Sequence, residues 1–374
     1  MDKVLKTKKK VRTKNKLSHK KMNNLIKPLV FMDPIKKSIL KSNKLLTHKE
    51  YLRLCRKLFN SHDGRKYRML THNIIKTQSK NSKNLILYMN FKSHNILEDK
   101  GRSKLYSIIK SYNPNIICLS EALLPISINN NKKSFGTHKA VIVDINNIND
   151  DTILQPYKAA DKFSDKKLRD YNGIKSVKDK WSSFLLKRGY KYIVFSNPYE
   201  CPWGENWGNC IITKEKPLDA YVLQMGSYGK IAFEKPESRS AVAVKINNEF
   251  ICSTHLDNSL DKCRIKQSKE LIKFIKKLKN VTLLGDLNSL NSQSYTKEEL
   301  KILQLLNIKS KKVPTDAVEL INKSGIFVKP LNTGQKYESL FQKCVTHVYS
   351  KIYKNSVMIF TDATGFDHQP IFVF

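Results

Sequence analysis

Seven polar side chains stand at the ends of apolar runs, at positions that a hydrophobic core does not favour. They are Asn73, Glu121, His255, Asp286, Asn288, Asp367 and His368. Side chains at strand ends can build a site on a rigid scaffold, so these residues are the first candidates for chemistry. Two of them, Glu121 and Asp367, carry the hard oxygen ligands that Mg²⁺ or Mn²⁺ prefers, and we expect them to bind such a metal.

The other five side chains suit the handling of a phosphate group. Asp286 can orient or deprotonate a water molecule, while His255 and His368 can stabilise or protonate phosphate oxygens. Asn73 and Asn288 can donate hydrogen bonds to a phosphate. Together these residue types predict metal-assisted phosphodiester hydrolysis, with His255, Asp286, Asn288 and His368 in catalytic roles.

The elements that must position these residues are mainly strands. Short apolar runs rich in β-branched residues, bounded by turn residues, predict strands over 67–74, 115–121, 190–196, 208–214, 239–246, 250–256, 281–288 and 370–374. Helices are expected over 104–112 and 259–279. Strands spread through the chain with few helices between them predict a layered α/β fold on mixed or antiparallel sheets.

The N-terminal part differs in composition from the rest. Residues 1–46 are rich in Lys, Asn and Ser and predict a basic, flexible tail, and residues 47–66 predict a short helix and a linker. The main domain is then expected over 67–374, with a polar insertion at about 126–178 that shows few periodic features.

The charge of the chain favours a polyanionic partner. Among 374 residues, 69 Lys and Arg against 32 Asp and Glu give a formal net charge of +37. Residues 1–66 contribute 21 − 4 = +17 and residues 67–374 contribute 48 − 28 = +20. Nucleic acid is the expected partner, and an anionic membrane surface is the alternative. A/T-rich coding is a competing reason for the excess of Lys, because the chain is also rich in Asn and Ile.

Several classes of protein are disfavoured by composition. A hydrophobic content of 40% argues against a wholly disordered polycation, and no apolar run approaches the roughly 18 residues of a transmembrane helix. The basic N-terminus lacks the apolar segment of a signal peptide, and seven Cys without CxxC spacing disfavour a disulfide scaffold. We therefore expect an intracellular monomer, in the reducing environment of cytoplasm or nucleus.

Six sequence blocks resemble the endonuclease/exonuclease/phosphatase superfamily, which has the DNase I-like fold. The blocks are LTHN (70–73), PNIICLSE (114–121), GNCIITK with ESRSAVAVKI (208–214 and 237–246), STHLDNSLDKCRIKQ (253–267), LLGDLNS (283–289) and FDHQPIF (366–372). The family forms are T-W-N, P-D-I-I-x-L-Q-E, G-N-x-x-I-x-S with R-x-x-x-V, T-H-L with R-x-x-Q, G-D-[FL]-N and S-D-H-x-P. Each block alone is weak, but six in the family's order are specific.

The resemblance implies a four-layered α/β/β/α sandwich, with two stacked mixed sheets and a site at one end of them. It also implies a divalent-metal phosphodiesterase or phosphatase in which Glu121 is a metal ligand. In the nuclease branch of the family a Glu near the position of Glu205 orients the histidine that matches His255. Arg239 matches the family's arginine, and we expect it to be an ion-pair partner rather than a substrate contact.

One position departs from the family pattern. The family has an Asp in an I-D-Y-I-like strand, where it hydrogen-bonds the last histidine, and the segment CVTHVYSK (344–351) places His347 there. Imidazole cannot supply the fixed negative charge of a carboxylate. Asp316 or Asp362 could supply it instead, or catalysis is weaker, or the protein binds without cleaving. Because the other polar positions match, we expect activity.

Three functions stay open at this point. A nuclease acting on DNA or RNA is favoured by the basic tail and body, since cationic side chains neutralise phosphates. A phosphodiesterase or phosphatase for lipids or small molecules, resembling a sphingomyelinase or an inositol-phosphate enzyme, matches the motifs equally well, and a polybasic tail can bind anionic lipid. The third is a catalytically weakened member that binds nucleic acid.

Overall fold

Most of the main domain is described by a computed structural model. The described residues are 60–80, 84–91, 99–123, 134–148, 181–199, 207–229, 236–292, 296–298, 300–301, 314–328, 330–331, 337–339, 342–343, 345–353, 355–359 and 368–374. The expected tail (1–46) and the short helix expected after it lie outside these residues, as does most of the expected insertion.

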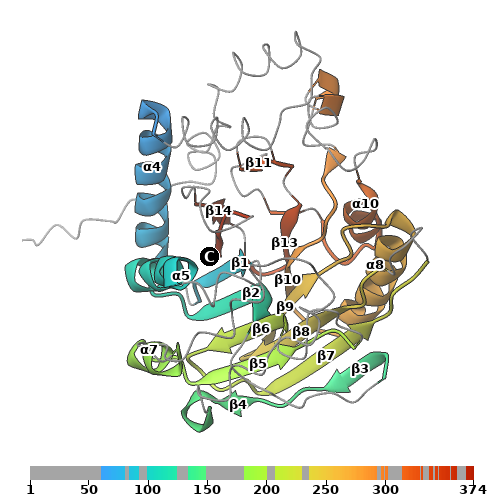
Figure 1. Ribbon diagram of the computed structural model, residues 1–374, viewed down its shortest axis with the longest axis horizontal. Helices are drawn as coiled ribbons and strands as arrows, with labels where there is room; N and C mark the ends of the chain where they lie inside the picture. Colours follow the sequence, from blue (N-terminus) through green and yellow to red (C-terminus); the bar gives the residue numbers. More distant parts are fainter. Residues whose placement is uncertain are drawn as a thin grey trace, which may run out of the picture.

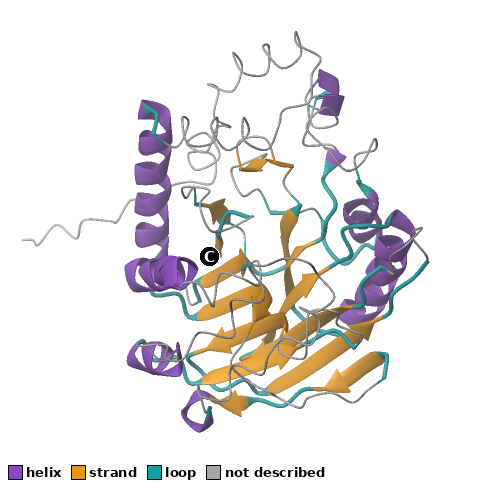
Figure 2. Ribbon diagram, viewed as in Figure 1, coloured by secondary structure: helices purple, strands orange, loops and turns teal. Residues whose placement is uncertain are grey.

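Two mixed β-sheets stack face to face at the centre of the molecule (Figures 1 and 2). The larger sheet has the strand order β14-β15-β1-β2-β6-β5-β4. Its strands are β14 (Ser356–Met358), β15 (Ile371–Val373), β1 (Ile86–Asn90), β2 (Ile116–Leu123), β6 (Trp207–Thr213), β5 (Tyr192–Ser196) and β4 (Val143–Asp144). Within it, β1 and β2 are parallel and the other pairs are antiparallel.

The smaller sheet has the strand order β13-β10-β9-β8-β7-β3. Its strands are β13 (Thr346–Ser350), β10 (Val281–Asp286), β9 (Glu249–His255), β8 (Arg239–Ile246), β7 (Asp219–Met225) and β3 (Gly136–Lys139). Here β9 and β10 are the parallel pair. A separate two-stranded hairpin is formed by β11 (Tyr337–Ser339) and β12 (Gln342–Lys343). Strands β3 and β4 show that part of the expected insertion pairs with the edges of both sheets.

Helices cover the outer faces of both sheets, on opposite sides of the molecule (Figure 1). Those over the seven-stranded sheet are α4 (His62–Ser79), α5 (Asp99–Tyr112) and α7 (Trp181–Lys187). Those over the six-stranded sheet are α8 (Asp261–Lys276) and α10 (Asp316–Lys323), and a 3₁₀ turn, η2, covers Ile145–Asn147. None of the helices in the described part of the chain combines the length and apolarity needed to cross a bilayer.

Three clusters of buried side chains define the layers. One joins the outer face of the seven-stranded sheet to α4, α5 and α7, and another joins the six-stranded sheet to α8 and α10. The third lies between the sheets, where residues such as Tyr88 and Cys118 face Val242 and Leu284. Alternate residues of a strand face opposite sides, so each sheet contributes to two clusters. This arrangement confirms the expected four-layered α/β/β/α sandwich.

The segment 67–74 is helical, so the prediction of a strand there was wrong. It lies within α4, where Leu70, Ile74 and Ile75 recur at helical spacing and face the core. Ser61 caps the helix by accepting a hydrogen bond from the Gly64 amide at 3.0 Å. The first strand of the sheet is β1 instead, whose residues are all buried, and it is the source of the first asparagine of the site.

Candidate active site

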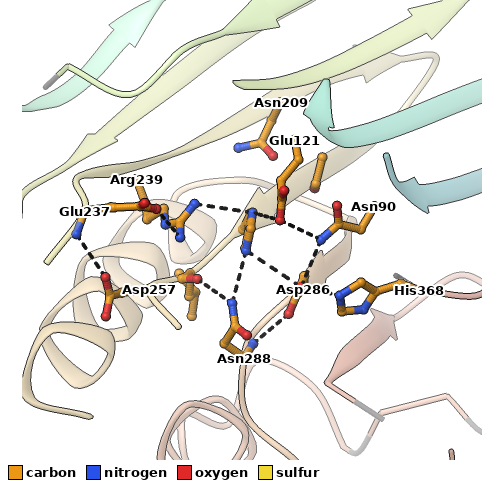
Figure 3. Close-up of polar contacts among 12 residues, drawn as sticks. Asn90, Glu121, Asn209, Glu237, Arg239, Asp257, Asp286, Asn288 and His368 are labelled. Carbon is orange, nitrogen blue, oxygen red and sulfur yellow. Dashed lines mark hydrogen bonds and ion pairs between the residues drawn. The ribbon is translucent and has the colours of Figure 1, made fainter. Parts of the chain in front are cut away.

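Polar side chains from both sheets converge at one end of the sandwich (Figure 3). They extend from the carboxyl ends of β1, β2, β9 and β10 and from the segment before β15. Both parallel pairs, β1–β2 and β9–β10, end here, which brings four strand ends to the same edge. The members of this cluster are Asn90, Glu121, His255, Asp286, Asn288 and His368, with Asn209 and Arg239 beside them.

Asn90 links the two carboxylates of the cluster. Its amide nitrogen donates to Glu121 Oε1 and to Asp286 Oδ2, both at 3.1 Å. The prediction had placed Asn73 in this position, but Asn73 lies on α4 and lines a cavity of about 520 Å³ between α4 and α5. The signal that identifies Asn90 is the fully apolar run LILYM before it, which is typical of a buried strand.

A β-bulge aims Glu121 into the site. The pairing of β2 with β6 shifts between Leu119 and Ala122, so that Ser120 and Glu121 together face Asn209. Glu121 has a φ of +52°, a left-handed conformation that residues other than Gly rarely adopt. Its side chain is 24% exposed, and burial raises the pKa of its carboxyl, opposed by the charge of Arg239 and the hydrogen bond from Asn90.

Asp286 and Asn288 form a tight turn at the end of β10. The Asn288 amide N–H donates to Asp286 Oδ1 at 2.9 Å, and Asn288 has a φ of +46°, which Asn tolerates. The Asn288 side chain donates to the carbonyl of Leu256 at 2.8 Å and lies 3.1 Å from His255 Nε2. The turn thus fixes a carboxylate and an amide next to each other.

His255 is buried between donors and carboxylates. Its Nδ1 lies 3.4 Å from Arg239 Nη1 and 3.6 Å from Glu121 Oε1, while its Nε2 lies 3.7 Å from Asp286 Oδ2. Burial lowers the pKa of His255 well below its ordinary value, and the charges of Arg239 and His368 lower it further. A second proton would also set an N–H against the donors of Arg239 and Asn288. Burial and the neighbouring Arg239 thus favour the neutral form of the imidazole.

Arg239 contacts His255 and is itself held by an ion pair and an aromatic ring. Its guanidinium pairs with Glu237 at 2.5 Å and lies 5.4 Å from the ring centroid of the buried Trp207. Glu237 is held in turn by Asp257, whose carboxylate accepts a hydrogen bond from the Glu237 amide at 3.0 Å. The ion pair agrees with the expectation for Arg239, and the contact with His255 shows that it also reaches the site.

Among the residues of β13, His368 contacts Thr346 rather than His347. His368 Nε2 lies 3.3 Å from Asp286 Oδ2, and Nδ1 lies 3.3 Å from Thr346 Oγ1. His347 is the next residue on β13, so its side chain faces the other way, and its Nε2 contacts the Ser289 carbonyl at 2.8 Å. The prediction that His347 occupies the family's Asp position was therefore wrong by one residue. Asp316, one of the two replacements considered, pairs with Arg264 on α8 instead.

Two of the predicted site residues lie outside the described residues. These are Asp367, the second expected metal ligand, and Glu205, the expected partner of His255. Asp362 falls in the same group. The roles assigned to all three stay predictions.

The cluster offers oxygen donors for a hard cation. Asn209 Nδ2 donates to the Ser240 carbonyl at 2.8 Å, which fixes the amide so that Oδ1 is left as the acceptor. That buried oxygen has no hydrogen-bond partner in the described part of the chain, and it lies beside Glu121 (Figure 3). Two oxygen acceptors next to each other favour a cation between them. Within the described ranges, no group of three His, Cys, Asp or Glu side chains is placed to hold a metal ion.

Comparisons with known proteins find solved structures with a similar fold. No protein-family model and no curated protein matches the sequence. Among solved structures, the chain is similar to a 3′ phosphatase from Neisseria bound to a product DNA hairpin (12% identity, TM-score 0.43, covering 78% of this chain and 98% of that one). It is also similar to an endonuclease/exonuclease/phosphatase from Bacteroides vulgatus (13%, 0.44, 78% and 97%) and to the human Nocturnin catalytic domain with bound sulfate (14%, 0.41, 78% and 93%).

Proposed function

We propose that the chain is a divalent-metal-dependent phosphodiester hydrolase, and that its substrate is nucleic acid. The observation that carries the proposal is the cluster itself, in which Asn90 joins Glu121 to Asp286 while His255 and His368 flank Asp286. Two carboxylates, two imidazoles and two amides at one end of a rigid sandwich are the groups that phosphodiester hydrolysis needs. The sequence blocks that resemble the endonuclease/exonuclease/phosphatase superfamily support the same reaction.

Glu121 would hold the metal, with the Asn209 oxygen as a further donor and Asp367 as the ligand expected from sequence. When bound, Mg²⁺ or Mn²⁺ supplies positive charge that polarises a phosphoryl oxygen and stabilises the charge that develops on it.

The side chains of the cluster divide the remaining work. Asp286 orients a water molecule and accepts its proton as the water oxygen bonds to phosphorus. The bond from phosphorus to the ester oxygen breaks, and the leaving oxygen takes a proton from solvent water. Asn288 donates to the phosphate, and neutral His255 donates through one ring N–H. His368, 3.3 Å from the Asp286 carboxylate, holds that carboxylate in place and also reaches the phosphate.

Charge favours nucleic acid over other phosphodiesters. The excess of +37 is divided between the N-terminal 66 residues and the rest of the chain, so both parts can contact phosphates along an extended polyanion. A lipid or an inositol phosphate would contact only the site or the tail. The proposal therefore predicts affinity that falls steeply with salt.

The test is a substrate panel incubated with the wild type in Mg²⁺ and in Mn²⁺. It contains single- and double-stranded DNA, RNA, sphingomyelin vesicles and inositol phosphates. Cleavage of a nucleic acid with the other substrates intact supports the proposal. Turnover of sphingomyelin or inositol phosphates alone would replace nucleic acid by that class, and salt-sensitive binding with no turnover anywhere would indicate a member that binds without cleaving.

A further inference from the structure

Next to the site, three hydrogen bonds between four buried hydroxyl and backbone groups connect the four strands that carry it. The Asp286 amide N–H donates to the Tyr88 hydroxyl oxygen at 2.8 Å, and the Tyr88 hydroxyl donates to Ser120 Oγ at 2.9 Å. Ser120 Oγ then donates to the Thr254 carbonyl at 3.3 Å. Tyr88, Ser120 and Thr254 are fully buried, and Asp286 nearly so.

The direction of this chain of hydrogen bonds is fixed by chemistry. A backbone N–H can only donate and a carbonyl can only accept, so each hydroxyl in between accepts one bond and passes its single proton onward. Aligned hydrogen bonds in a low-dielectric interior strengthen one another, and each group in the chain has its partner. We refer to Asp286 N–H, Tyr88, Ser120 and Thr254 carbonyl as the Tyr88 relay.

The Tyr88 relay touches every strand that ends in the site. Tyr88 precedes Asn90 by two residues on β1, and Ser120 precedes Glu121 on β2. Thr254 precedes His255 on β9, and Asp286 ends β10. Tyr88 and Ser120 belong to the seven-stranded sheet and the other two residues to the six-stranded sheet. The relay is thus one of several polar contacts between the sheets, such as that of Asn209 with the Ser240 carbonyl, and it includes the backbone of Asp286.

We propose that Tyr88 is a positioning residue. It fixes the backbone of Asp286 and thereby the position of the Asp286 carboxylate relative to Asn90, Glu121 and His255. This rests on the proposed function, because Asp286 is there the group that handles the attacking water. Apolar packing between two sheets leaves small sliding motions possible, whereas a hydrogen bond to the Asp286 backbone fixes the strand end itself. Small misplacements of a reacting group cost large factors in rate.

The Tyr88→Phe variant removes one hydroxyl and keeps the ring that fills the layer. We expect kcat for the cleaved substrate to fall about 10- to 100-fold, with KM within about twofold of the wild type. The matched control is Tyr349→Phe. Tyr349 is equally buried, on β13, and its hydroxyl has no hydrogen-bond partner among the described residues, so we expect wild-type kinetics there.

A second readout does not depend on activity. In protein labelled with ¹⁵N-aspartate, the Asp286 amide resonance should move upfield in Tyr88→Phe, and its hydrogen exchange should accelerate about tenfold. Tyr349→Phe should leave both unchanged. If Tyr88→Phe does not fold, Ser120→Ala serves instead. It keeps the acceptor for Asp286 but removes the acceptor for Tyr88, so its effects should lie between those of the wild type and those expected for Tyr88→Phe.

The failure of the Tyr88 positioning role and the failure of the proposed hydrolase function would give different results. A Tyr88→Phe variant with the wild-type Asp286 resonance, or with unchanged kcat, would overturn the positioning role. Equal losses in Tyr88→Phe and Tyr349→Phe would also overturn it, since they would indicate a general effect of removing buried hydroxyls. If the wild type cleaves no phosphodiester, the proposed function fails, and the resonance and exchange of Asp286 alone decide whether the relay holds its strand end.

Discussion

Thr346 is the residue where the site departs most clearly from a carboxylate-supported histidine. It offers a hydroxyl to His368 Nδ1 at 3.3 Å, where an Asp would offer a negative charge. We expect Thr346→Asp to raise kcat by up to about tenfold, because a carboxylate holds the ring more firmly against Asp286. Steady-state kinetics of the purified variant measure this.

The neighbouring variant His347→Asp serves as the control. Its carboxylate would face the Ser289 carbonyl, which cannot donate a hydrogen bond. We expect no gain in rate and a loss of about 1–3 kcal/mol in the free energy of unfolding. A gain in rate from His347→Asp, with none from Thr346→Asp, would contradict the geometry around His368.

The buried His255 gives the metal-free protein a dependence of stability on pH. Because its pKa is lowered in the folded state, the unfolded chain takes up a proton that the folded chain does not. The stabilisation is therefore present above the ordinary histidine pKa and is lost as pH falls below it, by up to about 1.4 kcal/mol per pH unit. Denaturant unfolding in EDTA between pH 7 and pH 5 should show a smaller loss for His255→Gln than for the wild type.

Most of the cluster could be predicted from the sequence because its members end apolar runs. Glu121, His255, Asp286 and Asn288 were predicted together and lie together. The wrong assignment of His347 has a simple cause. Neighbouring residues of a strand face opposite sides, so an error of one residue replaces Thr346, which contacts His368, by His347 on the other face. Sequence periodicity in a short strand does not resolve such a shift.

At the scale of elements, Gly208 controls how closely β5 and β6 approach. A Cβ at this position would lie 2.1 Å from the Ser196 carbonyl oxygen and 2.8 Å from Asn197 Cα. Both neighbours are backbone atoms, so Gly208→Ala must displace a strand, and we expect a loss of at least about 1–3 kcal/mol in the free energy of unfolding. Displacement of β6 would also move Asn209 and weaken activity.

The comparison for this prediction is Gly325→Ala, measured by the same denaturant unfolding. Gly325 has a φ of +72° and nothing within 4 Å of the added carbon, so only backbone strain of about 1–2 kcal/mol is expected, with activity unchanged. If Gly208→Ala retains activity and is the more stable of the two, the close approach of β5 and β6 does not matter.

Long apolar runs made most strands predictable, and the exceptions have physical reasons. In 67–74 the apolar residues could be read as a strand, yet the spacing of Leu70, Ile74 and Ile75 belongs to a helix that continues to Ser79. The run at 85–91 is the true buried strand; the turn residues Asn81, Ser82 and Asn84 precede it, but the sequence prediction did not include it. Strand β7 alternates buried and partly exposed residues only at its beginning, so its pattern is weak.

At the scale of the whole molecule, the charge can be tested by shortening the chain. Helix α4 packs on the core and begins after its cap at Ser61, so a deletion of residues 1–59 retains α4 and its cap. We expect this deletion to weaken nucleic-acid binding and to make the slope of log Kd against log salt shallower, with kcat unchanged. Binding titrations at several salt concentrations measure both. An unchanged slope would show that the body alone carries the contacts.

The most direct test of the account is Mg²⁺-dependent cleavage of a labelled oligonucleotide, measured for the wild type, Asp286→Asn and Glu121→Gln. We expect the wild type to cleave in Mg²⁺ and not in EDTA, and each variant to lose at least about 100-fold in rate. Asp219→Asn, which removes a carboxylate on β7 that contacts Lys139 and Tyr221, should cleave like the wild type. Cleavage that persists in EDTA, or in Asp286→Asn at the wild-type rate, would contradict the assignment of this cluster as the active site.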